Sequence, residues 1–157
     1  MEIKDIINKK IEIAERHVLK LIQSGDLKKL SDVEKYQISK FYEEKSRNRL
    51  ETAKIIYNAS KNNKENFKLG KNYKDYAEVV SAAYYSMYYI IHSFLALKYK
   101  TKLKEGLRGV HLITEHIILY YLVKTKKLAK HLYEEYLKTF KTTSQIQGIN
   151  IEDFQEK

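Results

Sequence analysis

The sequence predicts an all-α protein, an up-and-down bundle of four or five helices, and three observations support this prediction. The 157 residues contain no proline and only five glycines, so few positions interrupt a helix. Apolar residues recur every three or four positions over most of the chain, which is the spacing of one face of an α-helix. No segment of any length alternates apolar and polar residues at the period of a strand.

The first expected helix covers Glu2–Gln23, because its apolar residues form a single stripe. Gly25 follows this stripe and is expected to end the helix in the left-handed conformation. A short connection with Leu27 and Leu30 comes next. The residues of the stripe are Ile3, Ile6, Ile7, Ile11, Ala14, Val18, Leu21 and Ile22.

A second long helix is expected from Ser31 to Ser60. Ser31 and Glu34 have the spacing of a capping box, in which each side chain accepts a hydrogen bond from the other residue's backbone amide. The middle of this helix, at 43–49 (EEKSRNR), is polar on every side. Such a stretch is typical of a solvated helical bridge. It also fits a break between two helices, or a place where Arg47 or Arg49 contacts an acidic group.

The third expected helix extends from Asn72 to about Tyr99, with Asn72 and Asp75 as cap signals. Its segment 77–97 (AEVVSAAYYSMYYIIHSFLAL) has no charged residue between Glu78 and Lys98. The segment is apolar on two faces, so it predicts a buried central helix or a subunit interface. A membrane span is the third alternative, but the serines, the tyrosines and His92 in its middle favour a buried helix.

The rest of the chain predicts shorter elements and one domain. We treat 1–157 as a single domain with an N-terminal helix at about 1–30, the bundle at 31–143, and a tail or the start of a further helix at 144–157. The expected elements after the third helix are a basic turn at 100–106, helices at 108–124 and 127–141, a polar break at 142–148, and a helix start at Asn150.

The charge balance indicates either a polyanion partner or a solvated lysine surface. Lysine and arginine number 30 against 20 acidic residues, which gives a net charge of +10. RNA, DNA or an acidic protein would be attracted to such a chain, although the lysines are scattered among glutamates along the helices. The absence of cysteine excludes disulfides, and with no visible signal peptide we expect a cytoplasmic protein.

The most reactive-looking cluster is at 102–116 (KLKEGLRGVHLITEH), around an expected helix start. Free amides and the helix dipole favour an anion there. A histidine beside a cation can act as an acid or base on a phosphodiester, and it can equally cap the helix or fill a polar gap. The candidate catalytic residues are His111 and Arg108, and the candidate nucleic-acid-binding residues are Lys102, Lys104, Arg108 and His116.

Other site types find little support in the sequence. There is no glycine-rich phosphate loop and no His-Glu-x-x-His motif, and His111 and His116 point to different helix faces. We therefore expect no metal and no other cofactor. His17 and His131 lie in lysine-rich stretches and receive no role. Stacked bases would suit the tyrosines of the third helix, but a core or homodimer interface suits them better; these candidate interface residues are Tyr84, Tyr85, Tyr88, Tyr89 and His92.

Three stretches of the chain resemble the HEPN superfamily of small helical proteins, in particular a stand-alone archaeal and bacterial branch. The resemblance covers about Lys45 to Phe140. It rests on Tyr76 with SAAYYSMYYIIHSFLALKY at 81–99, on VHLITEHIILYYLV at 110–123, and on LAKHLYEEYLKTF at 128–140.

The resemblance implies a helical bundle that dimerises through its aromatic region. Many relatives pair with a nucleotidyltransferase in toxin–antitoxin operons, and others are metal-independent ribonucleases. The ribonucleases carry an Arg, a polar residue, and a His after four to six intervening residues. Here Arg108 precedes His111 by two intervening residues and His116 by seven, while Lys104 stands six before His111 and Lys126 four before His131. The catalytic motif therefore does not carry over.

Three functional hypotheses follow. The first is a HEPN-like protein associated with nucleic acid or a nucleotidyltransferase, in a toxin–antitoxin or defence system. The second is a metal-independent endoribonuclease that uses His111 as acid or base and Arg108 or Lys104 to stabilise the phosphorane charge. The third is a non-catalytic oligomerisation module.

Overall fold

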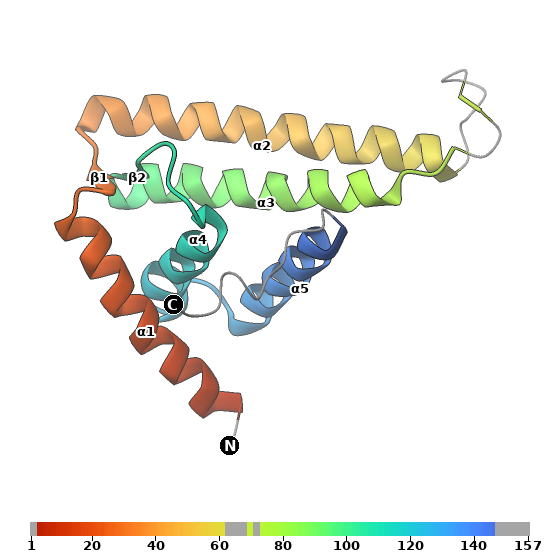
Figure 1. Cartoon of the computed structure of the whole chain (residues 1–157). Helices are drawn as coiled ribbons and strands as arrows, with labels where there is room; N and C mark the ends of the chain where they lie inside the picture. Colours follow the sequence, from red (N-terminus) through yellow and green to blue (C-terminus); the bar gives the residue numbers. More distant parts are fainter. Residues whose placement is uncertain (1–2, 62–68, 71–72, 147–157) are drawn as a thin grey trace.

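The computed structural model of the chain describes residues 3–61, 69–70 and 73–146 (Figure 1). These residues are mostly helical, which confirms the all-α class. The elements in order are α1 (Ile3–Gln23), β1 (Leu27–Lys29), α2 (Asp32–Lys61), α3 (Tyr76–Tyr99), β2 (Thr101–Leu103), α4 (Val110–Ile118), the π-helical turn η1 (Leu119–Val123) and α5 (Lys130–Ile146).

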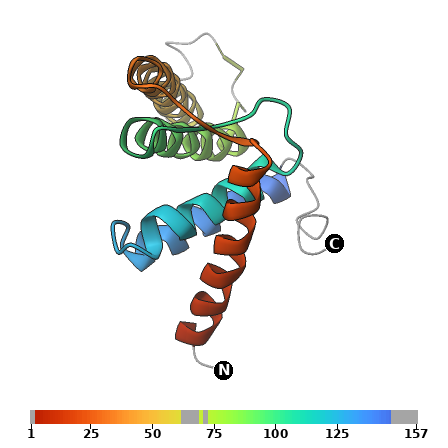
Figure 2. The same ribbon diagram turned by 90° about the vertical axis from the view of Figure 1, so that its left-hand side faces the viewer.

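Helices α2 and α3 form a long antiparallel hairpin (Figures 1 and 2). Buried serines join them at two places. The Ser46 hydroxyl donates to the Ser86 carbonyl oxygen at 2.8 Å, and the Ser93 hydroxyl donates to the Ser39 carbonyl oxygen at 2.8 Å. Because serine is small, the two backbones approach closely. Helix α2 is continuous through 43–49, so the expected alternative of a break there is not realised.

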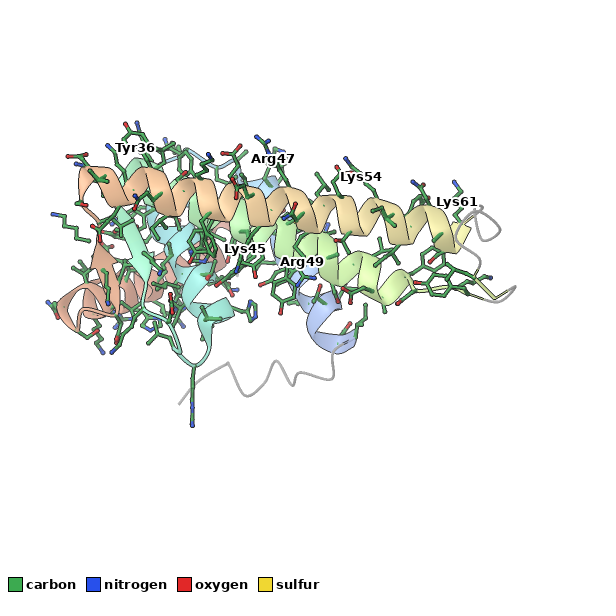
Figure 3. The ribbon with its side chains drawn as sticks, turned by 90° about the horizontal axis from the view of Figure 1, so that it is seen from above. Tyr36, Lys45, Arg47, Arg49, Lys54 and Lys61 are labelled. Atoms are coloured by element: carbon green, nitrogen blue, oxygen red, sulfur yellow. The ribbon has the colours of Figure 1, made fainter. Side chains whose placement is uncertain are left out.

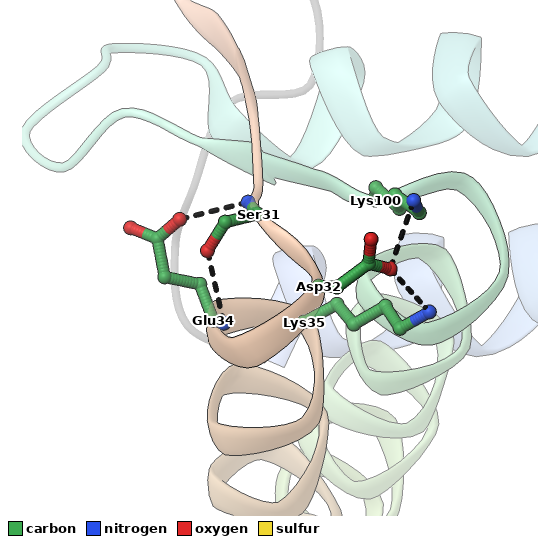
Figure 4. Close-up of polar contacts among 5 residues, drawn as sticks. All are labelled: Ser31, Asp32, Glu34, Lys35 and Lys100. Atoms are coloured by element: carbon green, nitrogen blue, oxygen red, sulfur yellow. Dashed lines mark hydrogen bonds and ion pairs between the residues drawn. The ribbon is translucent and has the colours of Figure 1, made fainter.

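The capping box at the start of α2 is confirmed (Figure 4). The Ser31 amide donates to Glu34 Oε2 at 2.8 Å, and the Glu34 amide donates to Ser31 Oγ at 3.2 Å. Asp32 lies beside Lys35 at 2.8 Å and Lys100 at 2.9 Å. Hydrogen bonds from these two ammonium groups lower the pKa of Asp32 to about 2. Lys100 ends α3 in the left-handed conformation, so this contact ties the start of α2 to the end of α3.

A small antiparallel sheet was not expected from the sequence. Strand β1 pairs with β2 so that Leu27 faces Leu103 and Lys29 faces Thr101. The basic turn at 100–106 thus contains a strand. A strand of three residues is too short to show an alternating pattern in the sequence. Its backbone groups are paired by β1, which lies in the connection between α1 and α2. Leu27 and Leu103 are both buried in the pair.

The remaining helices lie across one side of the hairpin (Figures 1 and 2). The up-and-down relation therefore describes α2 and α3, whereas α1, α4 and α5 form a second layer that crosses them. Two buried clusters join the layers, and α3 contributes Tyr84 to one and Leu95 to the other. The first contains Ala14, Tyr84, Ile118, Leu119, Leu122, Tyr133 and Tyr136; the second contains Val18, Leu21, Leu27, Leu95, Leu103, Ile113 and Ile117.

Several helix ends differ from those expected. Asp75 caps α3 by accepting from the Glu78 amide at 3.1 Å, whereas the expected start at Asn72 lies outside the described residues. Helix α4 begins at Val110, after Gly109 with φ of 65°. Helix α5 continues to Ile146, through most of the expected polar break, and the Thr142 hydroxyl within it donates to the Lys138 carbonyl oxygen at 3.0 Å. The expected start at Asn150 lies outside the described residues.

Candidate functional site

Cations and aromatic rings from α2 and α3 gather on the side of the hairpin that faces α4. Figure 3 shows Lys45 and Arg49 on this side of α2, whereas Arg47 and Lys54 lie on the opposite side. We call the surface that carries Lys45, Arg49, Tyr85 and Tyr89 the α4 face.

The cations of the α4 face lie over rings. Lys45 Nζ is 4.5 Å from the centre of the Phe41 ring and 5.3 Å from that of Tyr89. The Arg49 guanidinium carbon is 5.7 Å from the centre of the Tyr85 ring. Such contacts are electrostatically favourable, and they hold the positive groups along a row of aromatic surface. Tyr42 extends the row by stacking on Tyr89, with ring centres 6.1 Å apart.

His111 lies at the second position of α4 and contacts Tyr85 of this row and its neighbours on α3. Its ring centre is 6.0 Å from that of Tyr85 and 5.5 Å from that of Tyr88. Its Nδ1 atom is 2.7 Å from the hydroxyl oxygen of Tyr84. Burial lowers the pKa of His111 below the ordinary histidine value, so at neutral pH the ring is mostly uncharged.

The proton on the His111 ring depends on Tyr84. Tyr84 is 1% exposed, and burial raises its pKa far above the ordinary value, so its hydroxyl stays protonated. Its oxygen also lies 3.3 Å from the hydroxyl of Tyr136 on α5. When Tyr84 donates to Tyr136, it accepts from Nδ1–H of His111, and Nε2 then carries the basic lone pair. When Tyr84 donates to His111 instead, the ring proton lies on Nε2.

Beneath this site, His92 is a neutral histidine of the interior. It is 4% exposed, and its Nε2 atom lies 3.1 Å from the hydroxyl oxygen of Thr114. Thr114 donates its own proton to the Val110 carbonyl oxygen at 2.8 Å, so Nε2–H of His92 is the donor to Thr114. Burial, and then the charge of His111, lower the pKa of His92 to about 4. His92 therefore supports the beginning of α4.

The structure separates the candidate residues of 102–116. Lys102 pairs with Glu105 at 2.9 Å, and Lys104 with Asp26 at 3.7 Å. Arg108 is exposed in the connection before α4. His116 lies on another face of the helix from His111 and meets His17 of α1. The helix start thus brings His111 to the tyrosines, and the cluster does not form one site.

The candidate interface residues are divided between the interior and the α4 face. Tyr84 and His92 are covered within their own chain, whereas Tyr85, Tyr88 and Tyr89 are partly exposed. Exposed apolar side chains of α3 follow a different stripe, at Ile90 (46%), Phe94 (41%) and Leu97 (46%). Positions 86 and 93 face α2, so Tyr89 and this stripe lie on opposite sides of the helix contact.

The sequence did not predict that Lys45 and Arg49 would be the cations of the candidate site. One expected alternative for the stretch 43–49 was that Arg47 or Arg49 contacts an acidic group. Arg49 does so, because it lies 3.9 Å from Glu78 on α3. Arg47 pairs with Glu43 one turn earlier and points away from the site. A polar stretch at 43–49 does not reveal which of its cations face aromatic residues of a helix further along the chain.

Comparisons of the chain with family models, with curated proteins and with solved structures found no match. Within residues 3–61, 69–70 and 73–146, no three His, Cys, Asp or Glu side chains gather where a metal ion could be held. The described helices also include none with the length and apolar character to cross a bilayer.

Proposed function

We propose that the chain is a HEPN-like RNA-binding protein and that it takes single-stranded RNA on the α4 face. The observation that carries the proposal is the row of cation–ring contacts made by Lys45 and Arg49. Proteins that bind single strands combine aromatic platforms for bases with cations for phosphates. The net charge of +10 favours the approach of a polyanion.

RNA binding is tested by a charge-matched pair of double variants of α2. Lys45→Ala with Arg49→Ala removes two cations from the α4 face, and Arg47→Ala with Lys54→Ala removes two from the opposite side (Figure 3). Fluorescence anisotropy with a labelled single-stranded RNA should show about tenfold weaker binding for the first pair. The second pair should change binding little, because its side chains meet no rings of the platform.

Equal losses in the two double variants would contradict the proposed site, because net charge alone would then explain binding. The dependence of RNA affinity on salt concentration gives a second test. A cation that contacts phosphate contributes to the slope of log affinity against log salt, so the first pair should flatten that slope by about one unit or more.

A second candidate function is metal-independent RNA cleavage, which the contact between Tyr84 and His111 supports. In this reaction His111 Nε2 accepts the proton of a ribose 2′-hydroxyl. The hydroxyl oxygen then bonds to the adjacent phosphorus to form a 2′,3′-cyclic phosphate. The bond from phosphorus to the 5′ oxygen breaks, and this oxygen takes a proton from water and leaves as a hydroxyl. Arg49 joins Arg108 as a candidate to stabilise the phosphorane charge, because its guanidinium lies over the ring of Tyr85, which contacts His111.

A homodimer and a nucleotidyltransferase partner belong to the same proposal. We place the second copy on the stripe of Ile90, Phe94 and Leu97, because three large apolar side chains are exposed there at helical spacing along α3. The resemblance to HEPN proteins supports a toxin–antitoxin or defence role, and a nucleotidyltransferase reading frame beside this one would test it.

A further inference from the structure

Two histidines far apart in the sequence meet between α1 and α4. The Nδ1 atoms of His17 and His116 are 2.5 Å apart, and the two rings meet edge to face with centres 4.8 Å apart. Both side chains are partly buried. Two imidazoles in this arrangement are joined by one proton on the line between the Nδ1 atoms, which one ring donates and the other accepts. A second proton on that line would break the contact.

The charged groups around the pair leave little compensation for two positive rings. On α1, Lys20 lies one turn beyond His17, and its charge acts on that ring. Lys10 Nζ, also on α1, is 3.4 Å from Glu115 Oε1 of α4. Tyr133 of α5 donates to the same carboxylate oxygen at 2.8 Å. Glu115, next to His116, is thus already engaged, and Glu15 of α1 pairs with Lys124 beyond η1.

We propose that His17 and His116 form an acid-sensitive latch that holds α1 against α4 while at most one proton lies between them and releases it when both rings are protonated. The apolar side chains of α1, such as Val18, keep the core assembled in either state. The latch therefore governs how tightly the outer part of α1 is held, and it does not depend on RNA binding.

The direction of the pH effect follows from the two rings. Burial is the main cause that lowers the pKa of both rings, and the charge of Lys20 lowers that of His17 further. For His116, the charges of His17 and Lys10 also lower the pKa, and the charge of Glu115 opposes them without reversing the shift. Below the ordinary pKa of 6.5 the unfolded chain therefore binds more protons than the folded chain. Stability contributed by the pair is complete above pH 6.5 and is lost as the pH falls through the lower pKa values of the folded state.

Equilibrium unfolding in urea between pH 7.5 and 5.5 tests the latch. The wild type should lose stability on acidification, and the double variant His17→Gln with His116→Gln should lose less. The difference is about tenfold in the unfolding constant for each pKa unit by which folding lowers one ring. His131→Gln, at an exposed histidine of α5, is the matched control and should keep the wild-type dependence. A double variant that follows the control would overturn the proposal.

Two measurements on the wild type keep the test independent of whether the double variant folds. In a proton NMR titration, His17 and His116 should titrate as a coupled pair below 6.5, and two independent titrations near 6.5 would overturn the latch. Hydrogen-exchange protection of α1 amides, corrected for intrinsic rates, should fall more than that of α2 between pH 7.5 and 5.5. Equal changes in the two helices would also overturn it.

Discussion

The hydroxyl oxygen of Tyr84 lies 2.7 Å from Nδ1 of His111, and this contact joins the buried face of α3 to the beginning of α4. One oxygen atom thereby fixes the orientation of the imidazole, and the direction of its hydrogen bond decides which ring nitrogen carries the proton. A surface histidine has neither constraint, so this contact is where the candidate site can be tested most directly.

Tyr84→Phe should lower the free energy of unfolding by about 1–3 kcal/mol, because it leaves buried polar partners without the hydroxyl. Urea denaturation monitored by circular dichroism measures this change. Tyr36→Phe removes the same group from a side chain that is 61% exposed, so it should leave stability nearly unchanged. Equal effects from the two variants would contradict a structural role for the Tyr84 hydroxyl.

If the chain cleaves RNA, the reaction should proceed in EDTA and should be lost in His111→Ala. A general acid or base contributes about 10²–10⁴-fold to the rate, so labelled RNA on a denaturing gel shows the difference clearly. His131→Ala is the control and should keep full activity. Intact RNA at every wild-type concentration would remove the catalytic candidate and leave the binding proposal standing.

Phe94→Glu should convert the proposed dimer into a monomer, because it places a charge in the middle of the exposed apolar stripe of α3. Sedimentation velocity in moderate salt compares it with wild type. Lys98→Glu makes a charge change on an exposed position of the same helix and controls for altered surface charge. A wild type that sediments as a monomer would argue against a second copy on this surface.

Ser31→Ala should destabilise the fold by about 1 kcal/mol through loss of the cap of α2. The Glu34 amide would lose its acceptor, which lies 3.2 Å away. Gln37→Ala shortens a polar side chain at an exposed position within α2, so it should have a much smaller effect. Thermal or urea unfolding distinguishes the two variants. A loss of stability in Ser31→Ala no larger than that in Gln37→Ala would show that the cap contributes little.

His92 should remain neutral well below pH 6, because burial lowers its pKa from 6.5 to about 4. The unfolded chain binds the proton at higher pH than the folded chain does. The stability that this ring contributes is therefore present above pH 6.5 and is lost as the pH falls toward 4. Proton NMR should show a constant His92 resonance between pH 7 and 5.5, and titration near 6.5 would mean that the ring reaches solvent.

Patterns among residues close together in the sequence predicted most of the helices. The capping box at Ser31 and the apolar stripes predicted helices because they depend on residues within a few positions of one another, whereas the cap of α3 is Asp75 and the expected cap was Asn72. Leu27 pairs with Leu103, and His17 contacts His116. Both contacts join residues far apart in the sequence, so no local sequence pattern predicts them. Among the residues of the candidate site, the sequence analysis named His111 and did not name Arg49. The position of Arg49 over Tyr85 depends on how α2 packs against α3.

The serines inside the hairpin also determine what the α4 face presents to solvent. Ser39 meets Ser93, and Ser46 meets Ser86 two turns further along. Sliding one helix along the other by a single turn would leave these hydroxyls facing apolar neighbours. The same alignment brings Arg49 over Tyr85, so the spacing of charges and rings on the surface is set by hydroxyl pairs in the interior. A substitution on the α4 face therefore changes one side chain at a fixed position and leaves the alignment of α2 on α3 to the interior hydroxyl pairs.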